Sequence, residues 1–234
     1  MFGLFGSRKS AERRIAEKTP IAAASYAVVD TELTGLDDKK DSIVSVGAVR
    51  IDRGCIHLGN SFYRLVSPRT ELSAESVVIH EIMPCEVANE PGIDTVLGDF
   101  LDFCGDAVIV GHFVAIDIGF LNRELKRTNR PAISNPVLDT FSIYEWLRKR
   151  GKTGNCPSTL FSGYQLYELV SYFGIAVNGA HNALMDAYIT AQLLQRFFPL
   201  LVEAGAKDVG DLITIGTPFR GGDRFGLLGE FGNF

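Results

Sequence analysis

Two carboxylates, Asp30 and Glu32, stand two residues apart in the run YAVVDTELTGL from Tyr26 to Leu36. The apolar, β-prone residues before them predict a strand. Side chains alternate along a strand, so Asp30 and Glu32 should share one face. Two adjacent carboxylates repel each other unless a cation neutralises them. The pair therefore indicates a metal site, although acidic residues at strand ends also serve as solvated or capping groups.

A third carboxylate, Asp117, follows the β-prone run AVIVG that ends at Gly111. The residues after it have a helical pattern in which Ile118, Leu121 and Leu125 can face a core. Asp117 should lie in the first turn of that helix, beyond the carboxyl end of a strand, where open α/β sheets place ligands. An acidic residue in a first turn also stabilises the helix dipole, so this position alone does not decide between the two roles.

His181 and Asp186 flank the start of a third segment, an amphipathic helix with Asn182 as its predicted N-cap. The two residues are five positions apart, about 140° around a helix, so they could not share a helical face. We therefore place His181 on the loop before the helix and Asp186 in its first turn, where both reach one pocket. A lone histidine is usually structural, but an imidazole beside carboxylates can take a proton from water near neutral pH.

Together these segments resemble the three exonuclease motifs of the DEDD superfamily of 3′–5′ exonucleases. The matching stretches are DTELTG at 30–35, HFVAIDIGFL at 112–121 and HNALMDA at 181–187. The spacing from His181 to Asp186 is that of the histidine-bearing subgroup, which includes proofreading epsilon subunits of bacterial replicative polymerases, ribonuclease T and oligoribonuclease. The resemblance runs from about Tyr26 to Phe198 and is greatest to the epsilon-like branch.

The resemblance implies a two-metal site for phosphodiester hydrolysis that releases nucleoside 5′-monophosphates. In such sites two divalent ions roughly 3.5–4 Å apart clamp the scissile phosphate. Asp30 would bridge both ions, Glu32 and Asp186 would complete the site of the water-bearing ion, and Asp117 would hold the second. His181 would be the general base. Oxygen ligands favour Mg²⁺ or Mn²⁺ over zinc.

The resemblance also implies contacts to the nucleotide chain from residues beside the motifs. Ile79–Ile82 resembles an I-H-G-I stretch near the terminal nucleotide, with Glu81 in place of the usual glycine. Phe113 stands where asparagine is usual, and Ile116 stands where an aromatic residue is usual. A ring at 113 can stack or pack but cannot donate an amide hydrogen bond. The expected substrate-binding residues are Thr31, Leu33, Thr34, Gly35, His80 and Phe113.

The chain has 234 residues, of which 46% are hydrophobic, enough for one α/β domain with a full core. We assign that domain to residues 21–206, between a charged extension at 1–20 and a Gly/Phe-rich tail at 207–234. Segments 26–29, 43–51 and 61–66 predict an antiparallel meander. A strand and helix at 137–147 and a short helix at 164–175 resemble family elements. The resemblance implies a ribonuclease H-like mixed sheet, three antiparallel strands followed by parallel βα units, flanked by helices.

The net charge of −5 is unusual for a protein that coats long nucleic acid. An exonuclease holds only a few terminal nucleotides, so acidity limits unaided affinity without excluding the function. Basic residues recur at helical spacing after Asp117 and form a second run at 148–152. Each group either follows a phosphate backbone or forms a solvated face.

The four cysteines show no paired spacing, which favours free thiols in a reducing compartment. No stretch is apolar enough to span a bilayer, and residues 1–20 are too charged for a signal peptide. We expect no membrane association and a cytoplasmic location. Residues 1–5 form either a docking peptide for a polymerase or sliding clamp, or a frayed or packed terminus. The four phenylalanines after Gly216 predict a tail that packs on its own domain, a partner or a second copy in a homodimer.

Three functions remain, of which the first two share the same chemistry and the third is of another kind. The first is a metal-dependent 3′–5′ exonuclease on single-stranded DNA ends, either proofreading for a DNA polymerase or acting alone. The second is an exoribonuclease or short-oligonucleotide hydrolase, which would share every catalytic residue. The third is a non-catalytic module that binds nucleic acid or a polymerase, which we place last because all four carboxylates and the histidine are present.

Overall fold

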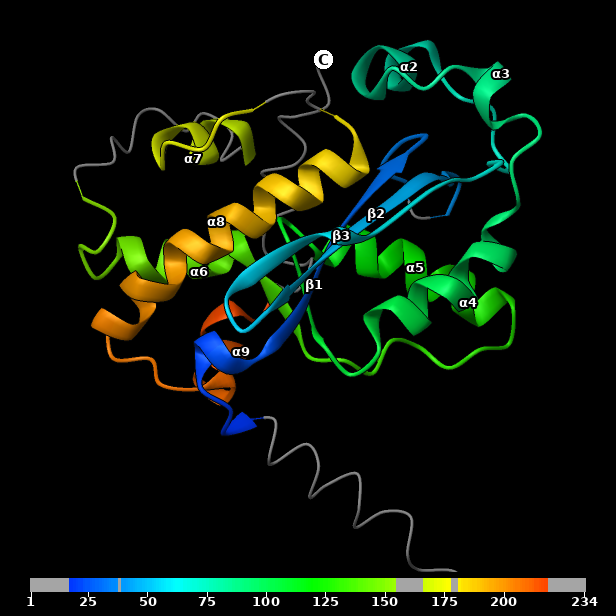
Figure 1. Cartoon of the computed structure of the whole chain (residues 1–234). Helices are drawn as coiled ribbons and strands as arrows, with labels where there is room; N and C mark the ends of the chain where they lie inside the picture. The colour runs from blue at the N-terminus through cyan, green and yellow to red at the C-terminus, as the bar shows by residue number, and fades with distance from the viewer. Residues whose placement is uncertain (1–16, 38, 155–165, 178–180, 219–234) are drawn as a thin grey trace, which may run out of the picture.

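A computed structural model describes residues 17–37, 39–154, 166–177 and 181–218. Its centre is one five-stranded mixed sheet with the strand order β3-β2-β1-β4-β5 (Figure 1). The pairs β1–β2 and β2–β3 are antiparallel, and β1–β4 and β4–β5 are parallel. The strands are β1 (Ser25–Leu33), β2 (Ile43–Asp52), β3 (Cys55–Leu65), β4 (Val108–Gly111) and β5 (Val137–Asp139). The predicted meander and the parallel βα units are confirmed.

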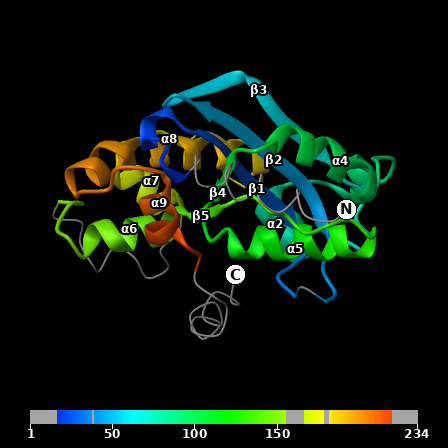
Figure 2. The same ribbon diagram turned by 90° about the horizontal axis from the view of Figure 1, so that it is seen from below.

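Apart from η1, α2 and α3, the helices form two groups on either side of the sheet (Figure 1). Figures 1 and 2 show α4 and α5 at one side of the molecule and α6 to α9 at the other, with α8 running across β1 and β2. The helices are η1 (Ile21–Ala23), α2 (Ala74–His80), α3 (Pro84–Val87), α4 (Ile93–Cys104), α5 (Ala115–Arg127), α6 (Thr140–Arg148), α7 (Leu166–Tyr172), α8 (Ala183–Glu203) and α9 (Val209–Gly216).

Strand β1 is buried on both faces, which explains its nearly continuous apolar sequence. Tyr26 and Val28 pack in the core cluster that includes residues of α6 to α9. Ala27 and Val29 pack in a second cluster with α4 and α5. The same alternation continues into Asp30 and Glu32, so both carboxylates lie on the α8 side of the sheet.

Two short connections fix the strands around β1. Arg53 and Gly54 join β2 to β3 with φ values of 51° and 75°. Two successive positive φ values are typical of the tight hairpin turns whose twist matches the strands. At the other end of β2, the Thr34 hydroxyl donates to Asp41 Oδ1 at 3.0 Å and accepts from the Ser42 amide.

The structure tests the expectations about cysteines, membrane helices and the two ends of the chain only within the described residues. Cys55, Cys85 and Cys104 are free thiols, while Cys156 lies outside the described residues. Within those residues, none of the helices combines the length and hydrophobicity that a membrane crossing requires. The docking peptide expected at residues 1–5 and most of the Phe-rich tail also lie outside the described residues.

At Gly47 of β2 the backbone of α8 comes very close to the sheet. Gly47 pairs with Asp30 across β1–β2. A Cβ atom at this position would lie 2.2–2.3 Å from the backbone of Ala183 and Leu184 in the first turn of α8. Only glycine permits this approach, which brings the start of α8, and with it Asp186, over the carboxylates of β1.

Replacing Gly47 by alanine should therefore push the start of α8 away from β2. We expect Gly47→Ala to lower the free energy of unfolding by about 1–3 kcal/mol, as overpacking does, and to reduce nuclease activity. Urea unfolding and a nuclease assay measure both effects. The matched control is Gly59→Ala on β3, where a Cβ atom meets nothing within 4 Å. Equal stability and activity in the two variants would contradict this role of Gly47.

Candidate active site

Three carboxylates gather where the end of β1 meets the first turn of α8. Oxygen atoms of Asp30, Glu32 and Asp186 all lie within 4.8 Å of one another. Glu32 is 8% exposed and Asp186 is 7% exposed. Asn182 caps α8, because its side-chain oxygen accepts from the Leu184 and Met185 amides. This cap fixes the first turn of α8, as predicted, and with it the position of Asp186.

Asp117 reaches the same end of the sheet from α5, in the opposite layer. It lies in the first turn of α5, is 6% exposed, and accepts a hydrogen bond of 2.6 Å from the Thr31 hydroxyl. Its negative charge raises the pKa of Asp30. Asp117 therefore lies near the cluster of Asp30, Glu32 and Asp186. It is held by Thr31, whose side chain lies on the opposite face of β1 from Asp30 and Glu32. Its place in the first turn also suits the helix dipole, so the two predicted roles are compatible.

Burial raises the pKa of all four carboxyl groups, and repulsion from neighbouring site carboxylates raises those of Asp30 and Glu32 further. Burial is the largest cause raising the pKa of Asp30 well above its usual value, and the three neighbouring carboxylates add to it. Burial raises the pKa of Glu32 to about 8, with the charges of Asp186 and Asp117 as further causes. Burial also raises the pKa of Asp117 to about 7 and that of Asp186 to about 6. The site is thus electrostatically unfavourable by itself near neutral pH.

His181 lies on the loop before α8, as predicted, and is exposed with a φ of 59°. Its backbone N–H donates to the Tyr167 hydroxyl at 2.6 Å, and that hydroxyl donates to Asp186 Oδ2 at 2.5 Å. The rings of Tyr167 and His181 meet edge to face at 4.9 Å between centroids. Sequence reasoning misses Tyr167. Its segment resembles a family helix, but nothing in the sequence marks its hydroxyl as part of the site.

Burial is the largest cause that lowers the pKa of His80, and the charge of the nearby His181 imidazole lowers it further. His80 is 5% exposed, and its Nδ1 accepts from the Ile82 amide at 3.0 Å. None of the described residues hydrogen-bonds to its Nε2 atom. Glu81 adopts a φ of 59°, the left-handed region that favours glycine, which agrees with the glycine usual at this position.

The other expected substrate-binding residues have structural contacts of their own. Leu33 packs against the core beside α4 and α5. Gly35 leaves room for the Asp41 carboxylate, since a Cβ atom there would come within 2.5–2.9 Å of it. The Phe113 ring packs 4.8 Å from that of Phe141, so this ring lies partly in the core.

Several residues of the two basic runs are engaged within the protein. Arg123 and Arg127 both donate to the buried Glu124, and Arg127 also donates to Asp94 at 2.5 Å. In the second run Arg148 donates to Glu145 at 2.8 Å. These ion pairs support the interpretation of the runs as a solvated helix face and a loop, and they reduce the charge that the runs can offer to a phosphate backbone.

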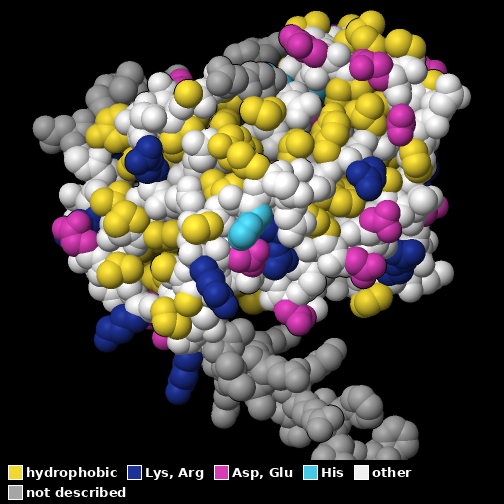
Figure 3. Space-filling model, viewed as in Figure 1, with side chains coloured by type: hydrophobic (Ala, Val, Ile, Leu, Met, Phe, Trp, Pro, Cys, Tyr) yellow, Lys and Arg dark blue, Asp and Glu magenta, His cyan; other side chains and the backbone are white. Residues whose placement is uncertain are grey.

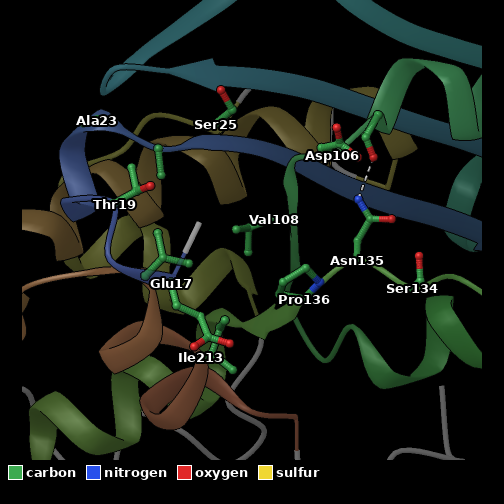
Figure 4. A pocket seen from close by; sticks show the side chains of 13 residues that line it. Glu17, Thr19, Ala23, Ser25, Asp106, Val108, Ser134, Asn135, Pro136 and Ile213 are labelled. Atoms are coloured by element: carbon green, nitrogen blue, oxygen red, sulfur yellow. Dashed lines mark hydrogen bonds between the residues drawn. The ribbon is translucent and has the colours of Figure 1, made fainter. Parts of the chain in front are cut away.

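A cavity of about 570 Å³ opens at the other end of the sheet (Figure 4). It is lined by Ser25 at the start of β1 and Val108 at the start of β4, together with Glu17, Asp106 and Ile213. Ser25 and Asp30 are five positions apart on an extended strand, which places them roughly 16 Å from each other. The cavity is therefore separate from the carboxylate site.

The architecture and the site define a class of protein. A mixed sheet with two carboxylates on its central strand, a third in the first turn of α5 and a fourth in that of α8 is that of ribonuclease H-like nucleases. A family model described as an exonuclease, of the ribonuclease T type, matches residues 27–194. The chain belongs to this exonuclease family and is a 3′–5′ exonuclease.

Relatives agree with this assignment over most of the chain. The DNA polymerase III epsilon subunit of Aquifex aeolicus is 30% identical over 212 residues, covering 88% of this chain and 96% of that protein. The PolC-type DNA polymerase III of Thermotoga maritima is 29% identical over 200 residues, covering 86% of this chain but 14% of the polymerase.

Solved structures share the fold at lower identity. Exonuclease X in complex with 5′-overhanging duplex DNA has a TM-score of 0.58 at 23% identity, covering 81% of this chain and 98% of that one. Escherichia coli exonuclease I in complex with a dT13 oligonucleotide has a TM-score of 0.67 at 18% identity, covering 77% and 42%. These likenesses confirm the expected ribonuclease H-like fold.

The residues at the site are compatible with divalent cations. Asp186 Oδ1 is buried, and none of the described residues donates a hydrogen bond to it, whereas Oδ2 accepts from Tyr167. A buried carboxylate oxygen without a donor is costly unless something positive binds it. The neighbouring donors are carboxylate oxygens, which are the ligands of hard cations such as Mg²⁺ and Mn²⁺.

The raised pKa values predict how the stability of the metal-free protein depends on pH. Because these carboxyls bind protons more tightly in the folded than in the unfolded chain, their protonation stabilises the fold. This contribution is complete below about pH 4, and it is lost as pH rises through the folded values of about 6, 7 and 8. In EDTA, the free energy of unfolding should therefore fall as the pH rises from about 5.5 to about 8.5.

Urea unfolding at several pH values measures this fall. Glu32→Gln should make this fall smaller. Replacing EDTA by Mg²⁺ should restore the free energy of unfolding at the alkaline end. The exposed Glu90 provides the matched variant, Glu90→Gln, which should leave the slope unchanged. A slope that is the same in Glu32→Gln as in the unchanged protein would show that the buried carboxyls do not oppose folding.

Proposed function

We propose that this exonuclease removes nucleotides one at a time from the 3′ end of single-stranded DNA, releasing 5′-monophosphates with the help of two Mg²⁺ or Mn²⁺ ions. The observation that carries the proposal is the cluster of Asp30, Glu32 and Asp186, with one buried Asp186 oxygen that lacks a donor among the described residues. Such a cluster suits the hydrolysis of a phosphodiester, whose negative charge needs positive partners.

Each residue of the site has a distinct role in this proposal. Asp30, Glu32 and Asp186 hold cations on the α8 side of β1, and Asp117 approaches from α5. Bound cations would neutralise the carboxylates, polarise the scissile phosphate and stabilise the leaving oxygen. His181 is exposed at the edge of the site, where it takes a proton from the attacking water.

An apolar surface beside the site suits unpaired bases. Hydrophobic side chains gather over α2 at the upper right of Figure 3. Val78 is 78% exposed, Ile79 43% and Met83 49%. Bases of a single strand pack on apolar and aromatic surfaces without regard to sequence. His80 Nε2, buried beside this surface and without a donor or acceptor among the described residues, suits a polar contact to the terminal nucleotide.

A role in DNA replication follows from the Aquifex relative, whose name assigns it to DNA polymerase III and which this chain matches over 96% of that protein's length. The net charge of −5 also supports dependence on a partner, because few positive charges are available to hold long DNA. We therefore propose proofreading in association with a DNA polymerase. Sliding-clamp binding and homodimer formation stay predictions from the sequence.

The direct test is a gel of 5′-labelled single-stranded DNA and of RNA with the same sequence, incubated with Mg²⁺, Mn²⁺ or chelator. We expect a metal-dependent ladder that shortens from the 3′ end of DNA. Asp186→Ala should abolish it, because it removes a carboxylate ligand. His181→Ala should slow it by about 10²–10⁴-fold, the usual contribution of a general base.

The matched control is His57→Ala. His57 is another exposed histidine, on β3, where its Nε2 lies 3.7 Å from Asp52. This variant should retain full activity. A ladder on RNA but not on DNA would assign the enzyme to the exoribonucleases instead. Full activity in His181→Ala would overturn the general-base role.

A further inference from the structure

Tyr167 connects two parts of the site that come from adjacent segments of the chain. Its hydroxyl donates to Asp186 Oδ2 at 2.5 Å and accepts from the His181 backbone N–H at 2.6 Å. Its ring also lies 4.9 Å from the His181 ring, edge to face. One side chain thus contacts a carboxylate of the metal-binding cluster and both the backbone and the ring of the histidine.

The position of Tyr167 is fixed by the packing of α7. Leu166, Leu169 and Val170 are buried in the core cluster shared with α6 and α8. The Tyr167 side chain itself packs against this cluster. A hydroxyl on a ring held in this way is a rigid hydrogen-bonding partner, because little rotamer freedom remains to be lost.

Both residues that Tyr167 contacts need such a partner. Asp186 has one oxygen held by the tyrosine and one without a donor among the described residues, so the hydrogen bond to Oδ2 determines where Oδ1 points. His181 has a φ of 59°, a strained conformation for a residue other than glycine, which persists only where surrounding contacts enforce it. The Tyr167 hydroxyl supplies one such contact.

We propose that Tyr167 is a positioning residue of the exonuclease: its hydroxyl orients Asp186 toward a bound cation and holds the His181 backbone so that the imidazole stays at the site. This inference rests on the proposed function. It assigns a task to a residue outside the carboxylates and histidine of the three motifs. Tyr167 acts on the reaction through Asp186 and His181 and needs no contact with the substrate.

The test compares Tyr167→Phe with the unchanged protein and with a matched control on the same helix. Tyr167→Phe keeps the ring and removes only the hydroxyl. Tyr172→Phe also removes one hydroxyl from α7, which donates to the Thr153 carbonyl at 2.7 Å, a contact outside the site. For each protein we would measure Mn²⁺ affinity by calorimetry without DNA, kcat and KM on single-stranded DNA, and the melting temperature.

Loss of the partners that orient metal ligands typically lowers metal affinity or activity by about 10–100-fold. We expect Tyr167→Phe to weaken Mn²⁺ binding and lower kcat within about this range, with little change in KM because the nucleotide contacts remain. Tyr172→Phe should leave Mn²⁺ affinity and kcat unchanged even if it lowers the melting temperature.

The outcomes separate this inference from the function on which it rests. If the unchanged protein binds Mn²⁺ and degrades DNA while Tyr167→Phe does both equally well, the positioning role is overturned and the exonuclease proposal stands. The positioning role is likewise overturned if Tyr167→Phe and Tyr172→Phe lose activity only in proportion to melting temperature. If the unchanged protein neither binds Mn²⁺ nor degrades DNA, the proposed function itself fails.

Discussion

Repulsion among four carboxylates, three of them buried and Asp30 half-buried, is the constraint on which the rest of this structure depends. Asp30, Glu32 and Asp186 share a space a few ångströms wide, Asp117 lies near it, and burial adds to their mutual repulsion. A folded chain keeps such a group together only if the surrounding core is strong enough to oppose it. Nearly continuous burial of β1 on both faces supplies that strength immediately before the carboxylates.

Three structural features bring the four carboxylates to the site. Strand alternation orients Asp30 and Glu32, the Thr31 hydroxyl holds Asp117, and the close approach at Gly47 lets α8 bring Asp186 over the sheet. The four carboxylates come from both layers of helices and from the central strand between them. The site therefore depends on the whole fold, whereas the cavity lies at the other end of the sheet and is lined by other residues (Figure 4).

Much of this arrangement follows from sequence because its causes are local. The strand pattern around Asp30, the N-cap at Asn182 and the loop position of His181 each depend on a few neighbouring residues, and each is confirmed. Contacts between distant segments are not encoded in that way. Tyr167 reaches Asp186 only because α7 packs beside α8, and Arg127 reaches Asp94 only because α5 packs beside α4.

The measurement that tests the central claim most directly is anomalous diffraction from crystals of the protein grown with Mn²⁺. If the carboxylates are gathered to bind cations, anomalous density should appear between Asp30, Glu32 and Asp186, with Asp186 Oδ1 as a ligand, and a second peak should lie beside Asp117. Crystals in millimolar Mn²⁺ with no density at these residues, or with Mn²⁺ bound only elsewhere, would contradict the account.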